Sequence, residues 1–190
     1  MHVGQDAKWR HHPRGGSFRK WSGNVLEVVD WSESARQHYR SDHVARIPDR
    51  EYWNIAGICW SELTSAITGF REYRQEEMAN NKSLTIYPHR DSDRVVLLGF
   101  LNTKVVRLFL SYLNPTVGMG IGDVTRIPWD PKMASEMPRE RVERLVELSR
   151  DDWISCEFAW DFRKHPLLAI SSAVTTTLKS KYSIWLAHAK

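Results

Sequence analysis

Apolar residues gather in three short stretches that are rich in β-branched and aromatic side chains, a composition typical of strands. The stretches are Val25–Trp31, Glu51–Leu63 and Ser83–His89, and the second is expected to end as a strand near Trp60. Polar connections separate them. The sequence therefore predicts several short strands.

Three further stretches have the patterns of helices. Ser32–Arg40 has the length of a short helix whose first residue can serve as the N-cap. Arg94–Leu113 is apolar on nearly every face, which predicts a buried helix that Asn102-Thr103 can break and cap again. Pro138–Trp153 is the clearest amphipathic helix, with proline at its start. Its apolar face consists of Val142, Leu145, Val146 and Leu148.

The remaining stretches predict connections and ends. Met1–Gly23 is polar, basic and glycine-rich, so we expect an arm or loop, and prolines favour loop and extended chain over Val117–Pro128. Leu167–Lys190 is ambiguous between strand and helix. The predicted fold class is α+β, with a mixed sheet. We expect a basic arm at 1–23, a recognition-type domain at 24–130 and a helical scaffold or spacer at 131–190.

Charge and cysteine content narrow the class of protein. The 190 residues carry a formal charge of +4 with a pI near 9.1, which favours an anionic partner only weakly. The positive charge is local, because Ala7–Ser22 has no acidic residue. Two distant cysteines, Cys59 and Cys156, indicate a reducing compartment. Without a signal peptide or a long apolar run, we expect a cytoplasmic protein without a membrane partner.

Two fragments of Leu113–Pro128 resemble parts of a methyltransferase site. Asn114-Pro115 resembles the start of an Asn-Pro-Pro-Tyr loop, but the second proline and the aromatic ring are replaced. The three glycines from Gly118 to Gly122 lack the upstream strand and the downstream helix that a cofactor loop needs. Neither fragment predicts a catalytic site.

Other catalytic arrangements are missing as well. No lysine stands two places after Glu51 or Glu157, as a nuclease site would need, and no histidine or cysteine stands at a metal-ligand interval. No nucleophile elbow is present. We therefore predict a non-enzymatic chain that uses no cofactor and no metal ion.

A binding surface is the remaining candidate. "GGSFRKWSGN" (15–24) and "GFREYR" (69–74) combine cations with aromatic and small polar residues, a mixture that suits contacts to phosphate and base. Solvated basic loops are the alternative interpretation. The predicted phosphate contacts are Lys8, Arg10, Arg14, Arg19 and Lys20. The predicted recognition face consists of Arg19, Lys20, Trp21, Asn24, Trp60, Ser61, Arg71, Tyr73 and Arg74.

Five stretches, taken together and in order, resemble one family. They are "GGSFRKWSGN", "GICWSELTS", "GFREY", "LLGFLNTKVVRLFLSYLNPTVGMGIGDVTRIP" and "RLVELSRDDWISCEFAWDFRKHPLL". From about residue 15 to 168 the chain resembles PglX-type adenine-specific DNA methyltransferases, the modification enzymes of BREX phage-defence systems. The "FRKWSGN" and "SRDDWISCEFAWDF" pieces are the most specific. The fourth stretch resembles, more loosely, specificity domains of type I and type IIG restriction–modification proteins.

The resemblance implies a function in recognition. In that family this region follows the methyltransferase core and recognises the target, so double-stranded DNA is the implied partner. Asn114 and Asp123 would be structural hydrogen-bonding residues in a scaffold that ends in a short Ile127-Pro128 strand. The family's catalytic segments are absent from this sequence, so we expect an excised domain, a truncated product or a stand-alone specificity subunit that transfers no methyl group alone.

One alternative function stays open. The chain could be a docking fragment that associates with a methyltransferase core or another defence subunit without binding DNA itself. Nine tryptophans and the amphipathic helix at Pro138–Trp153 favour it, because aromatic residues dominate the energetics of protein interfaces.

Overall fold

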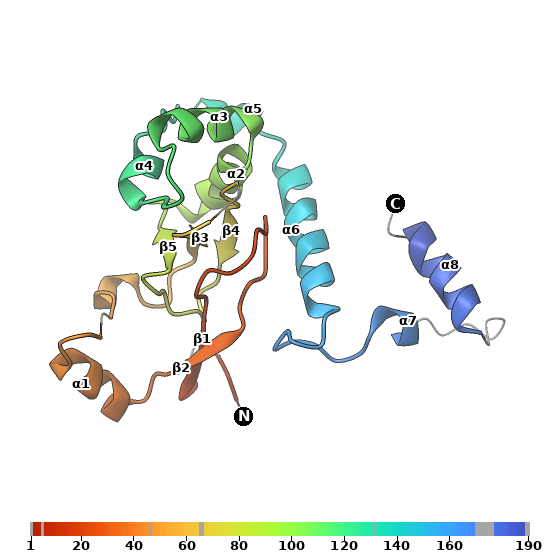
Figure 1. Cartoon of the computed structure of the whole chain (residues 1–190), viewed down its shortest axis with the longest axis horizontal. Helices are drawn as coiled ribbons and strands as arrows, with labels where there is room; N and C mark the ends of the chain where they lie inside the picture. The colour runs from red at the N-terminus through yellow and green to blue at the C-terminus, as the bar shows by residue number, and fades with distance from the viewer. Residues whose placement is uncertain are drawn as a thin grey trace.

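The computed structural model describes residues 2–4, 6–45, 47–64, 67–130, 132–169 and 177–188, and Figure 1 shows the whole chain. Its β part consists of two small antiparallel sheets. The first pairs β1 (Trp9–His12) with β2 (Glu27–Asp30). The second has β3 (Gly57–Ser61) between β4 (Arg71–Tyr73) and β5 (Ser83–Ile86).

Helices make up the rest of the regular structure. They are α1 (Glu33–Ser41), α2 (Asp91–Leu101), α3 (Lys104–Leu113), α4 (Ile121–Thr125), α5 (Met133–Glu136), α6 (Arg139–Ile154), α7 (Pro166–Ala169) and α8 (Leu178–His188). A 3-10 turn spans Arg50–Tyr52. Figure 1 shows α2 to α5 at the opposite end of the fold from the β1–β2 ribbon. The predicted α+β class is confirmed, whereas the predicted mixed sheet is not, because the named strands of both sheets pair antiparallel.

Local sequence signals account for the helix starts. The Ser32 hydroxyl accepts a hydrogen bond of 3.3 Å from the Ala35 amide at the start of α1. Thr103 caps α3 in the same way, accepting 3.3 Å from the Val106 amide. Because an N-cap satisfies an amide that the helix leaves free, these contacts fix where each helix begins. The predicted break at Asn102-Thr103 is confirmed.

The hydrophobic core lies between the three-stranded sheet and the helices. Ile58 and Trp60 of β3 point to one face and pack with buried side chains of α2, α3 and α4. All five residues of β3 are buried, so its second face is covered as well. Helix α6 closes on α2 at Gly99, where an added Cβ would lie 2.6 Å from the side chain of Val142. Glycine is needed there for the close approach of the two helices.

Several predicted elements differ from the structure. Met1–Gly23 contains strand β1, so the prediction of an arm or loop over this whole range is wrong. Val117–Pro128 contains α4, so the prediction of loop and extended chain throughout it is wrong as well. Ile127-Pro128 forms no strand. Helix α3 is not buried on every face, because Leu108 and Tyr112 are exposed. On α6, Val142 and Val146 are buried as expected, whereas Leu145 is 40% exposed.

The described parts of Leu167–Lys190 are helical, in α7 and α8, while residues 170–176, 189 and 190 lie outside the described ranges. The division of the chain at residues 23 and 130 stays a prediction. Within the described ranges no single helix has the length and apolarity needed to cross a membrane. Helices α2 and α3 have that length and apolarity only when they are taken together, and the pair is bent by 75°.

Candidate nucleic-acid interface

Half of the predicted contact residues are buried. None of these six side chains is more than 8% exposed. They are Arg10, Asn24, Trp60, Ser61, Arg71 and Tyr73. Burial to this degree is at odds with a place on a recognition face, where a side chain must be exposed to contact a ligand.

Ring packing, hydrogen bonds and strand pairing hold three of these buried residues in the interior of the fold. Trp60 packs against Phe70 at 5.6 Å between ring centroids, and its indole Nε1 donates to the carbonyl of Met119 at 2.9 Å. The Tyr73 hydroxyl donates to the Glu77 carbonyl at 2.8 Å. Arg71 lies directly across from Cys59 in the sheet. Each residue therefore has a structural position in or beside the sheet.

Arg19, one of the predicted contact residues, joins the N-terminal segment to helix α6. Arg19 donates to the carbonyls of Ser22 and Ser149 and to the carboxylate of Asp152, each at 2.7 Å. Its guanidinium lies 5.1 Å from the ring centroid of Trp153. Arg19 therefore fastens the N-terminal segment to α6.

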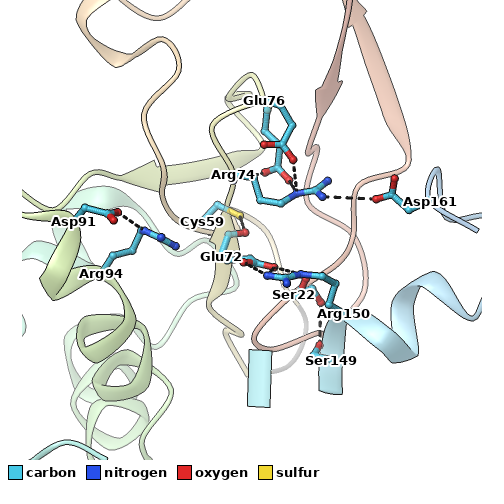
Figure 2. A network of polar contacts seen from close by, with 11 residues as sticks. Ser22, Cys59, Glu72, Arg74, Glu76, Asp91, Arg94, Ser149, Arg150 and Asp161 are labelled. Atoms are coloured by element: carbon cyan, nitrogen blue, oxygen red, sulfur yellow. Dashed lines mark hydrogen bonds and ion pairs between the residues drawn. The ribbon is translucent and has the colours of Figure 1, made fainter. Parts of the chain in front are cut away.

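Arg74 lies among three carboxylates in a polar network. Its Nε contacts Glu77 at 2.9 Å and Glu76 at 3.2 Å, and its Nη1 lies 3.6 Å from Asp161 (Figure 2). Burial raises the pKa of the Glu77 carboxyl to about 7, although Arg74 acts in the opposite direction. The Arg74 guanidinium is thus held in place by these acids, and its predicted contact with DNA stays a prediction.

Besides Arg19 and Arg74, which are also half-buried, four predicted contact residues reach the surface at least in part. Lys8 pairs with Asp30 at 3.4 Å and Arg14 with Glu27 at 3.2 Å, both on the β1–β2 ribbon. Trp21 is half-buried against the core, and Lys20 is half-buried beside it. The ion pairs of Lys8 and Arg14 are exposed and therefore weak, so either cation can leave its acidic partner for a phosphate.

The backbone around Lys20 is held firmly by the edge of β4. Trp21 donates its amide to the Phe70 carbonyl at 2.9 Å and accepts from the Glu72 amide at 2.8 Å. The side chain of Asn102 bonds both the amide and the carbonyl of Phe70, at 3.2 and 2.9 Å. The Lys20 ammonium in turn donates to the Asn102 carbonyl at 3.0 Å. Lys20 is thereby placed beside the start of α3.

Helix α3 adds two more cations. Lys104, Arg107 and Ser111 are spaced by three and four residues and so lie on one helical face, apart from buried Val106 and Leu110. We call Lys20, Lys104 and Arg107 the cationic edge. Burial lowers the pKa of Lys20, and Arg107 lowers it further, because like charges repel. Among the ion pairs of the described residues, none involves the cationic edge.

Lys104 and Arg107 are not among the predicted contact residues, because a stretch that is apolar on nearly every face predicts a buried helix. A signal was available: no acidic residue occurs from Arg94 to Gly122, so the two cations in the middle have no local partner. The spacing of Lys104, Arg107 and Ser111 was also readable as one polar face.

The segment that resembled methyltransferase fragments is a hydrogen-bonded scaffold. The side-chain amide of Asn114 donates through Nδ2 to the Gly118 carbonyl at 2.5 Å and to the Asp123 carboxylate at 2.6 Å. That carboxylate also accepts from the Gly120 amide at 2.9 Å. The predicted structural roles of Asn114 and Asp123 are confirmed. No group of histidine, cysteine and acidic side chains in the described residues could hold a metal ion.

Comparison with known proteins gives two relatives. The adenine-specific methyltransferase PglX of Lacticaseibacillus casei (strain Zhang) is 30% identical over 172 residues, which are 87% of this chain and 14% of the relative. The adenine-specific methyltransferase BrxX of Escherichia coli O9:H4 (strain HS) is 19% identical over 86% of this chain and 13% of the relative. The chain matches no protein-family model. It is thus homologous to a small part of much longer methyltransferases.

Proposed function

We propose that this chain is a DNA sequence-recognition module of a BREX-like adenine-specific methyltransferase, acting in the cytoplasm on double-stranded DNA. It would transfer no methyl group by itself. The observation that carries the proposal is the cationic edge, whose three positive charges have no acidic partner among the described residues. Unpaired cations on one surface suit the phosphates of a duplex, because they release its condensed counterions.

The two relatives support the same proposal, since both are named adenine-specific methyltransferases. Lys8 and Arg14 are proposed as outer phosphate contacts, and Trp21 as a neighbour of the bound strand. Arg10, Asn24, Trp60, Ser61, Arg71 and Tyr73 would act only indirectly, by supporting the segment that carries Lys20.

The salt dependence of duplex binding tests the cationic edge. Each phosphate contact contributes about −0.9 to the slope of log K against log salt concentration. Replacing both Lys104 and Arg107 with glutamine is therefore expected to reduce the slope by about 2 and to weaken binding at moderate salt. Fluorescence anisotropy of a labelled duplex at several salt concentrations measures both quantities. Arg141→Gln, an exposed cation on α6, is the control and should leave the slope unchanged, because Arg141 lies outside the cationic edge.

A second function is favoured by a different face of α3. Val105, Leu108, Phe109 and Tyr112 recur at helical spacing and are 43 to 79% exposed. An apolar stripe of this kind usually packs against another polypeptide. The chain would then be a docking fragment for a methyltransferase subunit or another defence protein, independent of DNA. Co-purification with such a subunit, lost in Leu108→Asp and without any duplex binding, would favour this second function over the first.

A further inference from the structure

A cavity of about 400 Å³ opens beside the cationic edge. Part of its lining is apolar and includes Phe70, Leu101 and Met119. The other part carries Lys20 and Arg107 together with hydroxyl groups such as that of Ser111. The volume lies within the usual range for sites that bind small organic ligands, which combine an apolar wall with a few polar groups.

The cavity has no negative charge nearby to balance its two cations. The described residues that line it include no aspartate or glutamate. The sequence segments that supply its walls are also free of acidic residues, over 7–26, 63–71 and 94–122. The neighbouring acid Glu62 is paired with Lys82 at 2.8 Å. A ligand with an anionic group is thus favoured over a neutral or cationic one.

Both cations line the same cavity, and Arg107 is close enough to lower the pKa of Lys20. Lys20 uses one of its three donor hydrogens on the Asn102 carbonyl at 3.0 Å, which fixes the ammonium and leaves two donors. The guanidinium of Arg107 offers a planar set of donors that suits phosphate oxygens. Ile67, which is half-buried, and Val117, which is exposed, belong to the apolar part of the lining and provide a surface against which a base can pack.

We propose that this cavity binds a single nucleotide unit, with its phosphate on Lys20 and Arg107 and its base against the apolar part of the wall that includes Ile67 and Val117. The unit is either a free nucleoside monophosphate or one nucleotide of a DNA strand whose base has left the stack. In the second case the inference rests on the proposed DNA-binding function and deepens it. In the first case the site operates independently of duplex binding.

Isothermal titration of the full chain with three probes tests the inference. The probes are dAMP, a short single-stranded oligodeoxynucleotide and a labelled duplex. Lys20→Met removes a charge at the cavity, and Ser111→Phe fills the space without changing any charge. Ser111 is exposed on α3, so the larger side chain is compatible with folding. Arg141→Gln is again the control, and thermal melting of each variant confirms that it is folded.

We expect the chain to bind dAMP or the oligonucleotide, and we expect Lys20→Met and Ser111→Phe each to weaken that binding about tenfold or more, as for other charge-assisted contacts. Binding of dAMP alone identifies a free nucleotide as the ligand, and binding of the oligonucleotide alone identifies a strand. Failure of both probes to bind, or binding that neither variant weakens, overturns the inference. If Ser111→Phe loses nucleotide binding but keeps duplex binding, the cavity binds a free nucleotide independently of the cationic edge. Nucleotide binding without any duplex binding would contradict only the proposed function.

Discussion

Replacing Arg150 with alanine is expected to lower the free energy of unfolding by about 3 kcal/mol, the lower end of the range for breaking a buried ion pair. Both guanidinium nitrogens Nε and Nη2 contact Glu72, at 2.8 to 3.1 Å (Figure 2). Glu72 is only 8% exposed, so without Arg150 its carboxylate would be left buried and unpaired. Because Arg150 itself is 43% exposed, water limits the loss. Urea unfolding followed by circular dichroism measures it.

Two further variants separate the buried pair from ordinary surface charge. Arg144→Ala on the same helix breaks an exposed pair with Glu147 at 3.1 Å, and it should cost no more than about 0.5 kcal/mol. The double replacement Glu72→Gln with Arg150→Met should recover most of the stability, because no buried charge is left alone. A loss no larger than that of Arg144→Ala would show that α6 does not depend on Glu72 for its attachment to β4.

The second large effect is expected at Trp60. Its side chain is fully buried in the core between the sheet and the helices. Trp60→Ala should lower the free energy of unfolding by about 3–5 kcal/mol, because a large cavity replaces the indole and the hydrogen bond to Met119 is lost. The measurement is urea unfolding by circular dichroism, since a change in tryptophan content would alter fluorescence. A chain of ordinary stability can be largely unfolded by such a loss.

Exposed Trp185, on α8, provides the matched replacement. Its side chain is 39% exposed, and Trp185→Ala should change stability within about 0.5 kcal/mol. The sequence analysis placed Trp60 on the recognition face. Normal stability of Trp60→Ala together with a loss of DNA binding would support that first interpretation and contradict the core position.

Local signals predicted most of the helices and strands. The caps at Ser32 and Thr103 and the proline before α6 each act within one turn of their helix, so they are visible in the sequence. Helix α4 begins where the Asp123 carboxylate accepts a hydrogen bond from the Gly120 amide. The glycine-rich sequence does not indicate this contact, so it did not predict the helix. Strand β1 was missed because its partner β2 is supplied from farther along the chain.

The candidate site was less predictable, because burial is decided by tertiary packing. "GICWS" and "FREY" contain residue types suited to nucleic-acid contact, yet β3 lies between two strands and is covered on both faces. Residue types alone do not indicate that both faces of β3 are buried. Lys20 was predicted from its basic and aromatic neighbours, whereas Arg107 joins it only because α3 begins where Asn102 holds both segments together.

Selection from a random pool of duplex DNA tests the central claim most directly. The chain alone is incubated with the pool at moderate salt, and the retained duplexes are sequenced. The account predicts enrichment of one short motif, and weaker retention of that motif by the Lys104→Gln, Arg107→Gln variant. Retention without enrichment would reduce the chain to a basic surface that holds DNA of any sequence, and no retention even at low salt would contradict the proposed DNA-binding function outright.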